Sequence, residues 1–597
     1  MTSAVLPSNA GVVMASASRR WGAVPARPGG RRFALVALAL GDTVAGTRPV
    51  RTGVVAERVS GGRRAGARRG RARPLVRARR APDNHARSPH PHRGRTTMAQ
   101  PPQQPGPSGP AERPAGRRQG TGRRAVLAGA ASAVAAGAAG LAAGPAAAAG
   151  RPGGPDDGRE SRRATAQPPD RELRALLREI DPRRIERTVR TLAAFGTRHT
   201  LSAQDDPERG IGAARDWIHE RMAAYAEESG GRMTVEVQSW IQEPGERIPR
   251  PTRLANVVAT LRGTEDPERV HVVSGHYDSR ASDVMDAESD APGADDDASG
   301  VAVVLELVRV MARRRPAATL VFAAVAGEEQ GLYGAAHLAE SLRRDGARVR
   351  AMFTDDIVGS STADDGSRDP YTVRLFAEGV PTAETAEEAE LRRKVGGEND
   401  SPSRQLARFV RDVAENEATG MRVRTVHRRD RYLRGGDHIP FLERGFPAAR
   451  FTEPAEDFAH QHQDVRVEDG KQYGDLPEFC DFDYIARVAR VNAAALWSLA
   501  VAPEAPPGAR ILTGSLTNDT ALEWERPPAG RGPRPVRYEI VRRETSRNEW
   551  THVRDVGDTT RHTVGLSKDN LFFGVRAVGP GGHRSPVAFP VPGEPAT

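Results

Sequence analysis

Three pieces of one stretch, SGHYDS (274–279), PGADDDASG (292–300) and VAGEEQG (325–331), decide both the fold and the chemistry that this sequence predicts. They place a histidine, three consecutive aspartates and a pair of glutamates where expected strands give way to loops or helices. Such side chains bind metal ions when they converge from several strand ends onto one point. The stretch therefore predicts a metal site, and we expect further ligands later in the chain.

Strand-like and helical runs alternate on both sides of this stretch. Apolar runs predict strands at 233–240, 256–263, 270–276, 318–326, 349–358 and 446–453, and helical spacing predicts helices within 170–230, 300–312, 332–344, 404–415 and 484–499. This alternation predicts an α/β fold with a largely parallel sheet that is covered on both faces. Sites in such sheets form at the carboxyl ends of the strands, where His276, Glu328 and Asp356 fall. Residues 360–435 are polar, and we expect surface insertions with some helix there.

The histidine and the aspartates divide into expected ligands and supporting residues. His276 ends a predicted strand, and Asp278 is suited to orient the second nitrogen of a ligating imidazole. Asp295, Asp296 and Asp297 would repel one another without a cation, because a helix dipole contributes only about 1 kcal/mol at most. Asp297 is also placed to cap the helix that follows, and both roles are compatible.

The two glutamates are predicted to have different roles. Glu328 and Glu329 are adjacent and project in different directions, so one can bind metal while the other faces the substrate as a base. Asp356 offers a further carboxylate at a strand end. His460 and His462, in FAHQHQD, are both candidates for the remaining nitrogen ligand. Each of these pieces alone would more often belong to an ordinary solvated loop, so the argument depends on the combination.

The order HxD, GADDDASG, GEE, a strand-end Asp and a late His resembles the bacterial dizinc aminopeptidases, whose relatives include glutamate carboxypeptidases and glutaminyl cyclases. The resemblance covers about residues 185–500. It implies a three-layer α/β/α domain with a mostly parallel mixed sheet, and two zinc ions that activate a water molecule for peptide hydrolysis. It assigns the site residues as follows: His276 and Asp356 on one zinc, Glu329 and His460 on the other, Asp296 as the bridge through a cis peptide to Asp297, Glu328 as general base, Asp278 and Asp297 in support, and Asp437 and His438 near the substrate pocket.

The resemblance selects His460 as the last ligand because Asp464 follows it four residues later, as the family pattern requires. Ala459 departs from the pattern, since some members have a tyrosine there. We expect a zinc aminopeptidase. Carboxypeptidase action, a one-zinc glutaminyl cyclase or a binding protein without activity are the alternatives, and retention of all five ligands and of the base disfavours the last two.

The charge of the chain is concentrated at its beginning. Residues 1–149 hold 25 Arg, no Lys and four acidic residues, which leaves 63 basic and 73 acidic residues in the remainder. We therefore expect no nucleic-acid partner and a disordered or misassigned extension at 1–97. Residues 98–149, with Arg123-Arg124 before an Ala-rich run, resemble a twin-arginine signal that is cleaved near 147–150. We expect a secreted protein without a stable membrane anchor. With Cys480 as the only cysteine, no intramolecular disulfide can form.

The composition changes again after Pro503. Short strand-like runs separated by turns predict a small β-sandwich, and residues 504–594 resemble a fibronectin type III domain with Trp524, Tyr538 and Ile540 in its core. Leu571 stands where that family usually has its corner tyrosine. We expect the peptidase domain at 168–502, with peptides or proteins as substrates, and attachment to a polymer or surface through the C-terminal module.

Overall fold

The structure of the protein is a computed structural model that describes residues 162–593. The predicted extension at 1–97 and the signal sequence at 98–149, with its cleavage point, lie outside the described residues. Within the described range, no helix has both the length and the apolar character needed to cross a membrane.

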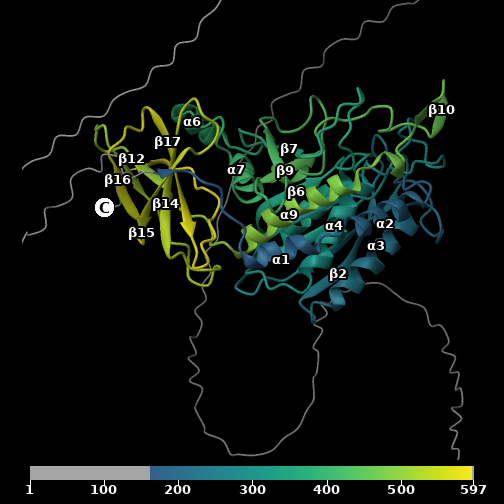
Figure 1. The fold of residues 1–597 in the computed structure, drawn as a ribbon, viewed down its shortest axis with the longest axis horizontal. Coiled ribbons are helices and arrows are strands. Elements are labelled where there is room, and N and C mark those ends of the chain that lie inside the picture. The colour runs from purple at the N-terminus through teal and green to yellow at the C-terminus, as the bar shows by residue number, and fades with distance from the viewer. Residues whose placement is uncertain (1–161, 594–597) are drawn as a thin grey trace, which may run out of the picture. The chain divides into compact units, whose positions relative to one another are not determined.

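An eight-stranded mixed sheet forms the centre of the α/β part, in the order β2-β3-β5-β4-β6-β9-β7-β8. The pairs β2–β3, β3–β5 and β7–β9 are antiparallel, and the other four neighbouring pairs are parallel. The α/β prediction with a mixed sheet is therefore confirmed (Figure 1). The strands are β2 (Met233–Gln242), β3 (Thr252–Leu261), β4 (Asp266–His276), β5 (Ala318–Val325), β6 (Arg348–Asp355), β7 (Thr372–Phe376), β8 (Arg422–Val426) and β9 (Ala448–Thr452).

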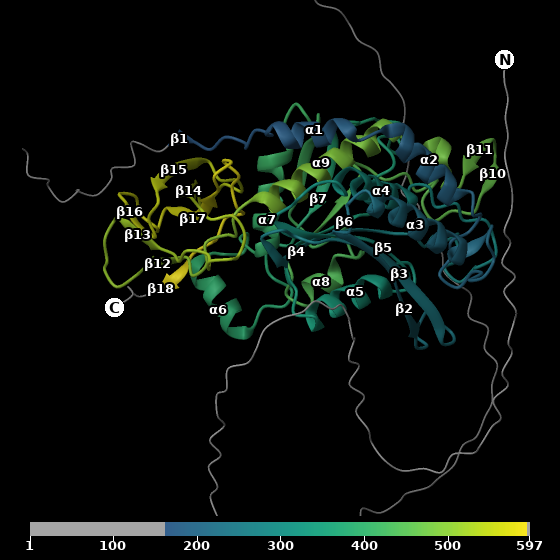
Figure 2. The same cartoon turned by 90° about the horizontal axis from the view of Figure 1, so that it is seen from below.

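Helices cover both faces of this sheet, as Figure 2 shows. Successive strand residues point to opposite faces, so Val273 of β4 packs in the larger core while Val272 packs in the smaller one. The larger core lies under α1 (Arg171–Glu179), α2 (Pro182–Ala193), α3 (Gly210–Glu227), α4 (Ala298–Met311), α7 (Pro402–Ala414) and α9 (Phe482–Val501). The smaller core lies under α5 (Tyr333–Arg344) and α8 (Ile439–Leu442).

Helix α4 occupies the middle of the larger core, and its sequence explains this position. ASGVAVVLELVRVM has buried residues all round the helix, as a helix without a solvent face requires. Its first turn is capped by the Asp297 side chain, which accepts a hydrogen bond from the Gly300 amide. The helix therefore begins directly after the three aspartates and fixes where they lie.

The expectation of surface insertions at 360–435 was wrong in part, because this region supplies two strands of the central sheet. β7 lies between β9 and β8, and β8 forms the outer edge; the same region also supplies the helix α6 (Ala386–Val395). The sequence of β8, RVRTV, alternates arginine with valine, and one side of the strand is exposed. An edge strand of this kind lacks the continuous apolar run by which buried strands were recognised.

The C-terminal residues form most of two four-stranded sheets, ordered β1-β15-β14-β17 and β16-β13-β12-β18. The two-residue strand β1, at the beginning of the described range, joins the first sheet by pairing with β15. Trp524, Tyr538 and Ile540 are buried together between them. The boundaries at 168–502 and 504–594 and the fibronectin type III resemblance stay predictions. The remaining elements are β1 (Arg162–Arg163), β10 (Arg466–Glu468), β11 (Lys471–Tyr473), the 3-10 helix η1 (Pro477–Phe479), β12 (Arg510–Leu512), β13 (Thr520–Glu523), β14 (Arg537–Glu544), β15 (His552–Gly557), β16 (Arg561–Val564), β17 (Leu571–Val578) and β18 (Val591–Gly593).

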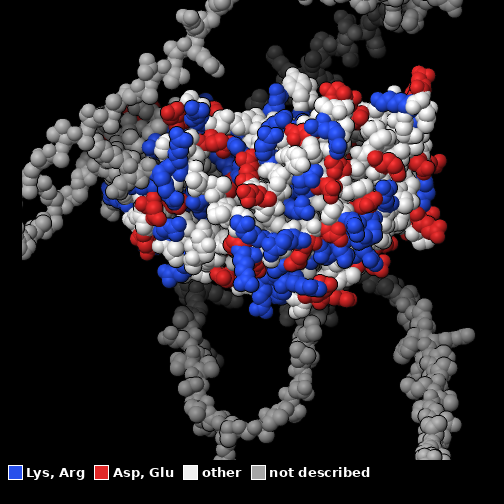
Figure 3. All heavy atoms as spheres, viewed as in Figure 1, with Lys and Arg blue, Asp and Glu red and all other residues white. Residues whose placement is uncertain are grey.

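Charges of both signs are mixed over the face seen in Figure 3. Acidic side chains lie among the basic ones across most of this face, so the described part does not carry the strong positive excess of residues 1–149.

Candidate metal centre

Three parallel strands end at the same edge of the sheet and bring the predicted residues together. β4 ends at His276, which pairs in register with Val325, the last residue of β5. β6 lies on the other side of β4 and ends at Asp355, next to Asp356. The glutamate pair follows β5 after a short turn, and Gly327 takes a φ of +75°, which favours glycine at that turn. The carboxyl edge of the sheet is therefore where these side chains converge.

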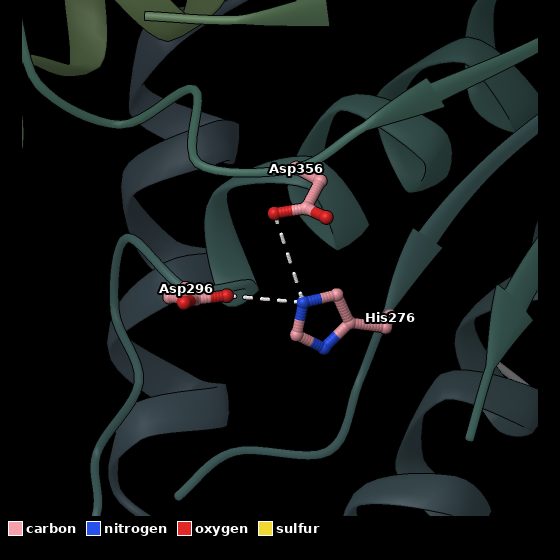
Figure 4. A group of neighbouring side chains, drawn as sticks. All are labelled: His276, Asp296 and Asp356. Carbon is pink, nitrogen blue, oxygen red and sulfur yellow. Dashed lines mark ion pairs between the residues drawn. The ribbon is translucent and has the colours of Figure 1, made fainter. Parts of the chain in front are cut away.

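The first cluster consists of His276, Asp296 and Asp356, all three buried (Figure 4). His276 Nε2 lies 3.0 Å from Asp296 Oδ1 and 3.9 Å from Asp356 Oδ1. On the other side of the ring, Nδ1 donates to the Asp278 carbonyl at 3.1 Å, which orients the ring with Nε2 turned toward the two carboxylates. These three side chains can hold one metal ion.

The second cluster consists of Asp296, Glu329 and His462. His462 Nε2 lies 2.9 Å from Asp296 Oδ2 and 2.9 Å from Glu329 Oε1. Burial lowers the pKa of His462, but the adjacent carboxylates of Glu329 and Asp296 raise it to about 10. The two oxygens of Asp296 therefore face two different clusters, as a bridging carboxylate must.

The choice of His460 is corrected by this geometry. The His460 ring stacks on Phe479 at 3.6 Å and its Nδ1 lies 3.4 Å from Asp457, away from the glutamate pair. Asp464, whose spacing favoured His460, instead accepts a hydrogen bond from the Ser282 amide at 3.0 Å. His462 has a left-handed backbone with φ of 54°, and no spacing rule reveals which ring such a turn directs inward.

The three aspartates point in three directions. Asp295 Oδ1 accepts from the Gly359 amide at 2.6 Å, and burial together with the charge of Asp475 raises the pKa of Asp295 well above its ordinary value. Asp297 caps α4 and accepts from the His276 amide at 2.9 Å. The Asp296–Asp297 peptide is cis, as the family resemblance implied. Asp296 alone of the three reaches the centre.

Asp278 does more than orient His276. Its carboxylate accepts hydrogen bonds from the Gly327, Glu328 and Glu329 amides at 3.0, 3.3 and 3.2 Å. Thr200 Oγ1 adds a fourth at 3.0 Å. Burial alone would raise the pKa of Asp278, but the His276 ring, whose Nδ1 lies 3.6 Å from Asp278 Oδ1, and the hydrogen bonds from Thr200 and the Glu329 amide hold it below the usual range. Asp278 therefore fixes the loop that carries both glutamates.

Glu328 is half-buried beside the two clusters and has no side-chain hydrogen bond among the contacts of the described residues. Burial raises its pKa well above the ordinary glutamate value, and the negative charges of Asp356, Glu329 and Asp437 add to this, although His276 opposes it. A carboxyl group with a raised pKa next to paired metal ligands is suited to take up and release a proton.

Asp437 and His438 lie against the centre, as the sequence indicated. Asp437 is fully buried, and neither of its carboxylate oxygens has a hydrogen-bond partner among the described residues. Burial and the charge of Asp356 raise its pKa to about 7, with His276 acting against them. His438 Nε2 donates to the Arg429 carbonyl at 2.7 Å.

Sequence reasoning missed several residues that hold the centre in place. Asp475 accepts from the Asp295 and Asp296 amides, both at 2.8 Å, and Gln461 Nε2 donates to Asp296 Oδ2 at 3.2 Å. Arg450 Nη2 donates to Asp356 Oδ1 at 2.6 Å. Arg198 is buried and donates to the backbone carbonyls of Tyr277 and Gly293 at 2.8 Å each. Isolated polar residues far along the chain gave no local signal for these contacts.

The donor set fits divalent metal ions. Buried atoms without a hydrogen-bond partner in the described part of the chain converge on both clusters: His276 Nε2, Asp296 Oδ1, Glu329 Oε1 and Asp356 Oδ2. Leaving such atoms unpaired is costly unless something else binds them. Imidazole and carboxylate ligands in this ratio suit zinc. Two clusters of candidate metal ligands share Asp296 at the carboxyl edge of an α/β sheet, an arrangement that favours a metal-dependent hydrolase.

Comparison with known proteins identifies the family. The model described as peptidase family M28 matches residues 256–468. A protein of Leptosphaeria maculans is 54% identical over 425 residues, covering 71% of this chain and 98% of its own length, and one of Pyricularia oryzae is 55% identical over 433 residues, covering 72% and 86%. Both are named probable zinc metalloprotease. The chain belongs to peptidase family M28. These relatives are fungal, whereas the sequence pattern had pointed to bacterial enzymes.

Solved structures are more distant. The LapA aminopeptidase of Legionella pneumophila is 18% identical with a TM-score of 0.40, covering 55% of this chain and 73% of its own. A glutaminyl cyclase of Porphyromonas gingivalis is 15% identical with a TM-score of 0.37, covering 53% and 98%.

Proposed function

We propose that this member of family M28 is a zinc aminopeptidase that uses two metal ions. His276 and Asp356 would hold one zinc, Glu329 and His462 the other, and Asp296 would bridge them. One observation carries the proposal: Asp296 Oδ1 lies 3.0 Å from His276 Nε2, while Oδ2 of the same side chain lies 2.9 Å from His462 Nε2. The names of the fungal relatives support zinc as the metal.

Glu328 would carry the proton during hydrolysis. Zinc ions bound at the two sites would polarise the scissile carbonyl and acidify a water molecule. Glu328 takes the proton of that water and passes it to the leaving amine, a task for which its raised pKa is suited. Asp278 keeps Glu328 and Glu329 in their separate positions through the backbone amides that it accepts.

The charge of the centre supports action at the amino end of a peptide. Carboxylates outnumber the two buried guanidinium groups of Arg198 and Arg450 around the centre, which disfavours the binding of a substrate carboxylate there. A free ammonium group is the complementary substrate end. The carboxylates concerned are Asp278, Asp296, Asp297, Glu328, Glu329, Asp356 and Asp437.

The test compares aminoacyl chromogenic substrates and short peptides with the same peptides blocked at the amino group, together with the zinc content of the protein. An aminopeptidase with two zinc ions releases the first residue and is inactive on blocked peptides. Hydrolysis of blocked peptides would indicate carboxypeptidase or endopeptidase action instead. Cyclisation of an amino-terminal glutamine with a single bound zinc would indicate a glutaminyl cyclase. Zinc binding without any turnover would leave a binding protein.

We also propose that the protein is exported by the twin-arginine route and acts on peptides or proteins outside the cell, with no nucleic-acid partner and no stable membrane anchor. The basis is the Arg123-Arg124 pair and the Ala-rich run after it. Amino-terminal sequencing of secreted protein should begin near 147–150, and a mature protein that retains residues before Met98 would contradict the proposal. The C-terminal β-strand region would attach the enzyme to a polymer or surface, which removal of 504–594 should abolish without loss of turnover on soluble peptides.

A further inference from the structure

Arg450 connects a proposed metal ligand to a loop that reaches the surface. Its side chain starts in the short strand β9 and is fully buried. Nη2 donates to Asp356 Oδ1 at 2.6 Å and to the Asp356 carbonyl at 3.2 Å. Nη1 donates to the Gly435 carbonyl at 3.0 Å and lies 3.6 Å from Asp430 Oδ2. One guanidinium group therefore holds Asp356 on one side and residues of another segment on the other.

That segment, residues 427–438, runs from the end of β8 to the edge of the metal centre and is called here the 427–438 loop. At its outer end, Tyr432 is 75% and Leu433 is 92% exposed. At its inner end, Gly436 packs so closely that a Cβ atom there would lie 2.6 Å from Arg450 Nη1 and 3.3 Å from Asp356 Oδ2. The loop therefore touches the ligand aspartate at the place where the guanidinium binds it.

The choice of arginine suits this position. Asp356 Oδ2 has no hydrogen-bond partner in the described chain, so the guanidinium fixes the carboxylate through Oδ1 and leaves the second oxygen free. A planar guanidinium donates in two directions at once, whereas a lysine ammonium could satisfy the aspartate or the loop but is too short and compact to do both in the same way.

We propose that Arg450 is a positioning residue that couples the His276–Asp356 metal site to the 427–438 loop. Metal binding fixes the Asp356 carboxylate, which fixes the Arg450 guanidinium and, through it, the Gly435 carbonyl of the loop. An ordered loop in turn holds the Asp356 carboxylate in the orientation that binds the metal. Because such coupling is reciprocal, the loop should become more ordered when zinc binds, and the loop contacts should strengthen zinc binding. The inference rests on Asp356 being a metal ligand, which belongs to the proposed function.

The loop provides its own readout, since Arg428, Arg429, Arg431 and Arg434 are trypsin cleavage sites. Limited trypsin digestion of the full chain, with and without zinc and followed by mass spectrometry, measures the order of the loop. Competition with a chromogenic chelator measures the zinc affinity of each site. Wild-type protein should bind two zinc ions, and zinc should slow cleavage within the loop.

Two variants and a control separate the parts of the coupling. Arg450→Met should lower the binding affinity for one of the two zinc ions by about 10–100-fold and leave the affinity for the other unchanged. It should also abolish the effect of zinc on loop cleavage. Arg450→Lys should keep most of the zinc affinity and still lose the protection of the loop. Arg348→Met removes a partly buried arginine at the beginning of strand β6, the opposite end from Asp356, where it pairs with Glu504 at 3.0 Å. This variant should retain both zinc ions and the protection.

Arg450 variants that match the wild type in both measurements would overturn the coupling while leaving the proposed function intact. If Arg450→Met fails to fold by circular dichroism, Arg450→Lys decides the question, because persistence of zinc-dependent protection in that variant contradicts the proposal. A wild-type protein that binds no zinc would overturn the proposed function and the coupling together. The two failures are therefore distinguishable in the wild-type protein alone.

Discussion

Replacement of His462 by alanine is the sharpest test of the metal centre, because His460 provides a matched control two residues away. Both histidines belong to the same short segment, so the two substitutions remove the same chemical group from neighbouring positions. Only His462 lies within 2.9 Å of Asp296 and Glu329, whereas His460 stacks on Phe479. We expect His462→Ala to lose one zinc ion and His460→Ala to keep both.

The size of the effect follows from the number of ligands. A four-ligand zinc site yields about 10–16 kcal/mol of binding free energy, or roughly 3 kcal/mol for each ligand. At about 1.4 kcal/mol for each factor of ten, loss of the imidazole should weaken the second zinc at least about 100-fold. The first zinc keeps His276, Asp296 and Asp356, so its affinity should change much less.

The assay is a chelator titration of the zinc-loaded proteins, resolved into a tight and a weak equivalent, with release of an aminoacyl chromogen measured in parallel. His462→Ala should show one tight equivalent and strongly reduced turnover, and His460→Ala should behave as the wild type apart from a modest loss of stability from the ring stacked on Phe479. The assignment would be refuted if His460→Ala lost the second equivalent while His462→Ala retained it.

Four other outcomes follow from the centre. Glu328→Gln should keep both zinc ions yet lower kcat by about 10²–10⁴-fold, whereas Glu329→Gln should lose zinc; equal zinc loss in both would contradict their separate roles. Asp475→Ala leaves two buried amides unpaired and should lower the free energy of unfolding, measured with denaturant, by about 2–6 kcal/mol. Asp475→Asn keeps one acceptor and should lower it less. An unchanged unfolding midpoint in Asp475→Ala would contradict the supporting role of Asp475. Because the pKa of His462 is raised to about 10 without metal, zinc affinity at its site should rise with pH up to that value, about tenfold per unit, as chelator titrations at several pH values would show. In the metal-free protein, the stabilisation from protonated His462 is fully present below the ordinary histidine pKa of 6.5 and should be lost as the pH rises through about 10. The difference in unfolding free energy between the wild type and His462→Ala, taken at several pH values, measures this stabilisation.

The first half of the centre could be predicted from the sequence because strand ends position it. His276, Asp356 and the glutamate pair follow apolar runs that the structure confirms as the neighbouring parallel strands β4, β6 and β5. Parallel strands bring their carboxyl ends to one edge of the sheet for any conformation of the loops. The convergence of these residues could therefore be predicted without knowledge of loop conformation. Asp296 was equally predictable, since the buried helix α4 begins directly after it.

The last ligand could not be predicted in the same way because a loop positions it. The segment from Glu453 to the β10–β11 hairpin has no regular element between β9 and β10. In such a segment the direction of a side chain depends on single backbone torsions, such as the φ of 54° at His462, and on anchors such as the hydrogen bonds between Asp464 and Ser282. The edge strand β8 was missed for a related reason, since its exposed arginines interrupt the apolar signal. Strand β7 is buried but has only five residues, too few for a clear apolar run.

The supporting carboxylates explain how so many acidic side chains can be gathered before any metal binds. Asp278 accepts three consecutive amides of the 327–329 loop, and Asp475 accepts two consecutive amides beside Asp296. The charges of Asp278 and Asp475 are thus offset by backbone dipoles as well as by the nearby Arg198, and Arg450 offsets that of Asp356, which reduces the repulsion among the carboxylates. The same hydrogen bonds fix the backbone at Asp295–Asp296 and at residues 327–329, so that the side chains of Asp296, Glu328 and Glu329 point toward the centre. The metal sites are therefore built largely by the polypeptide itself, and zinc should bind a centre that is already in place.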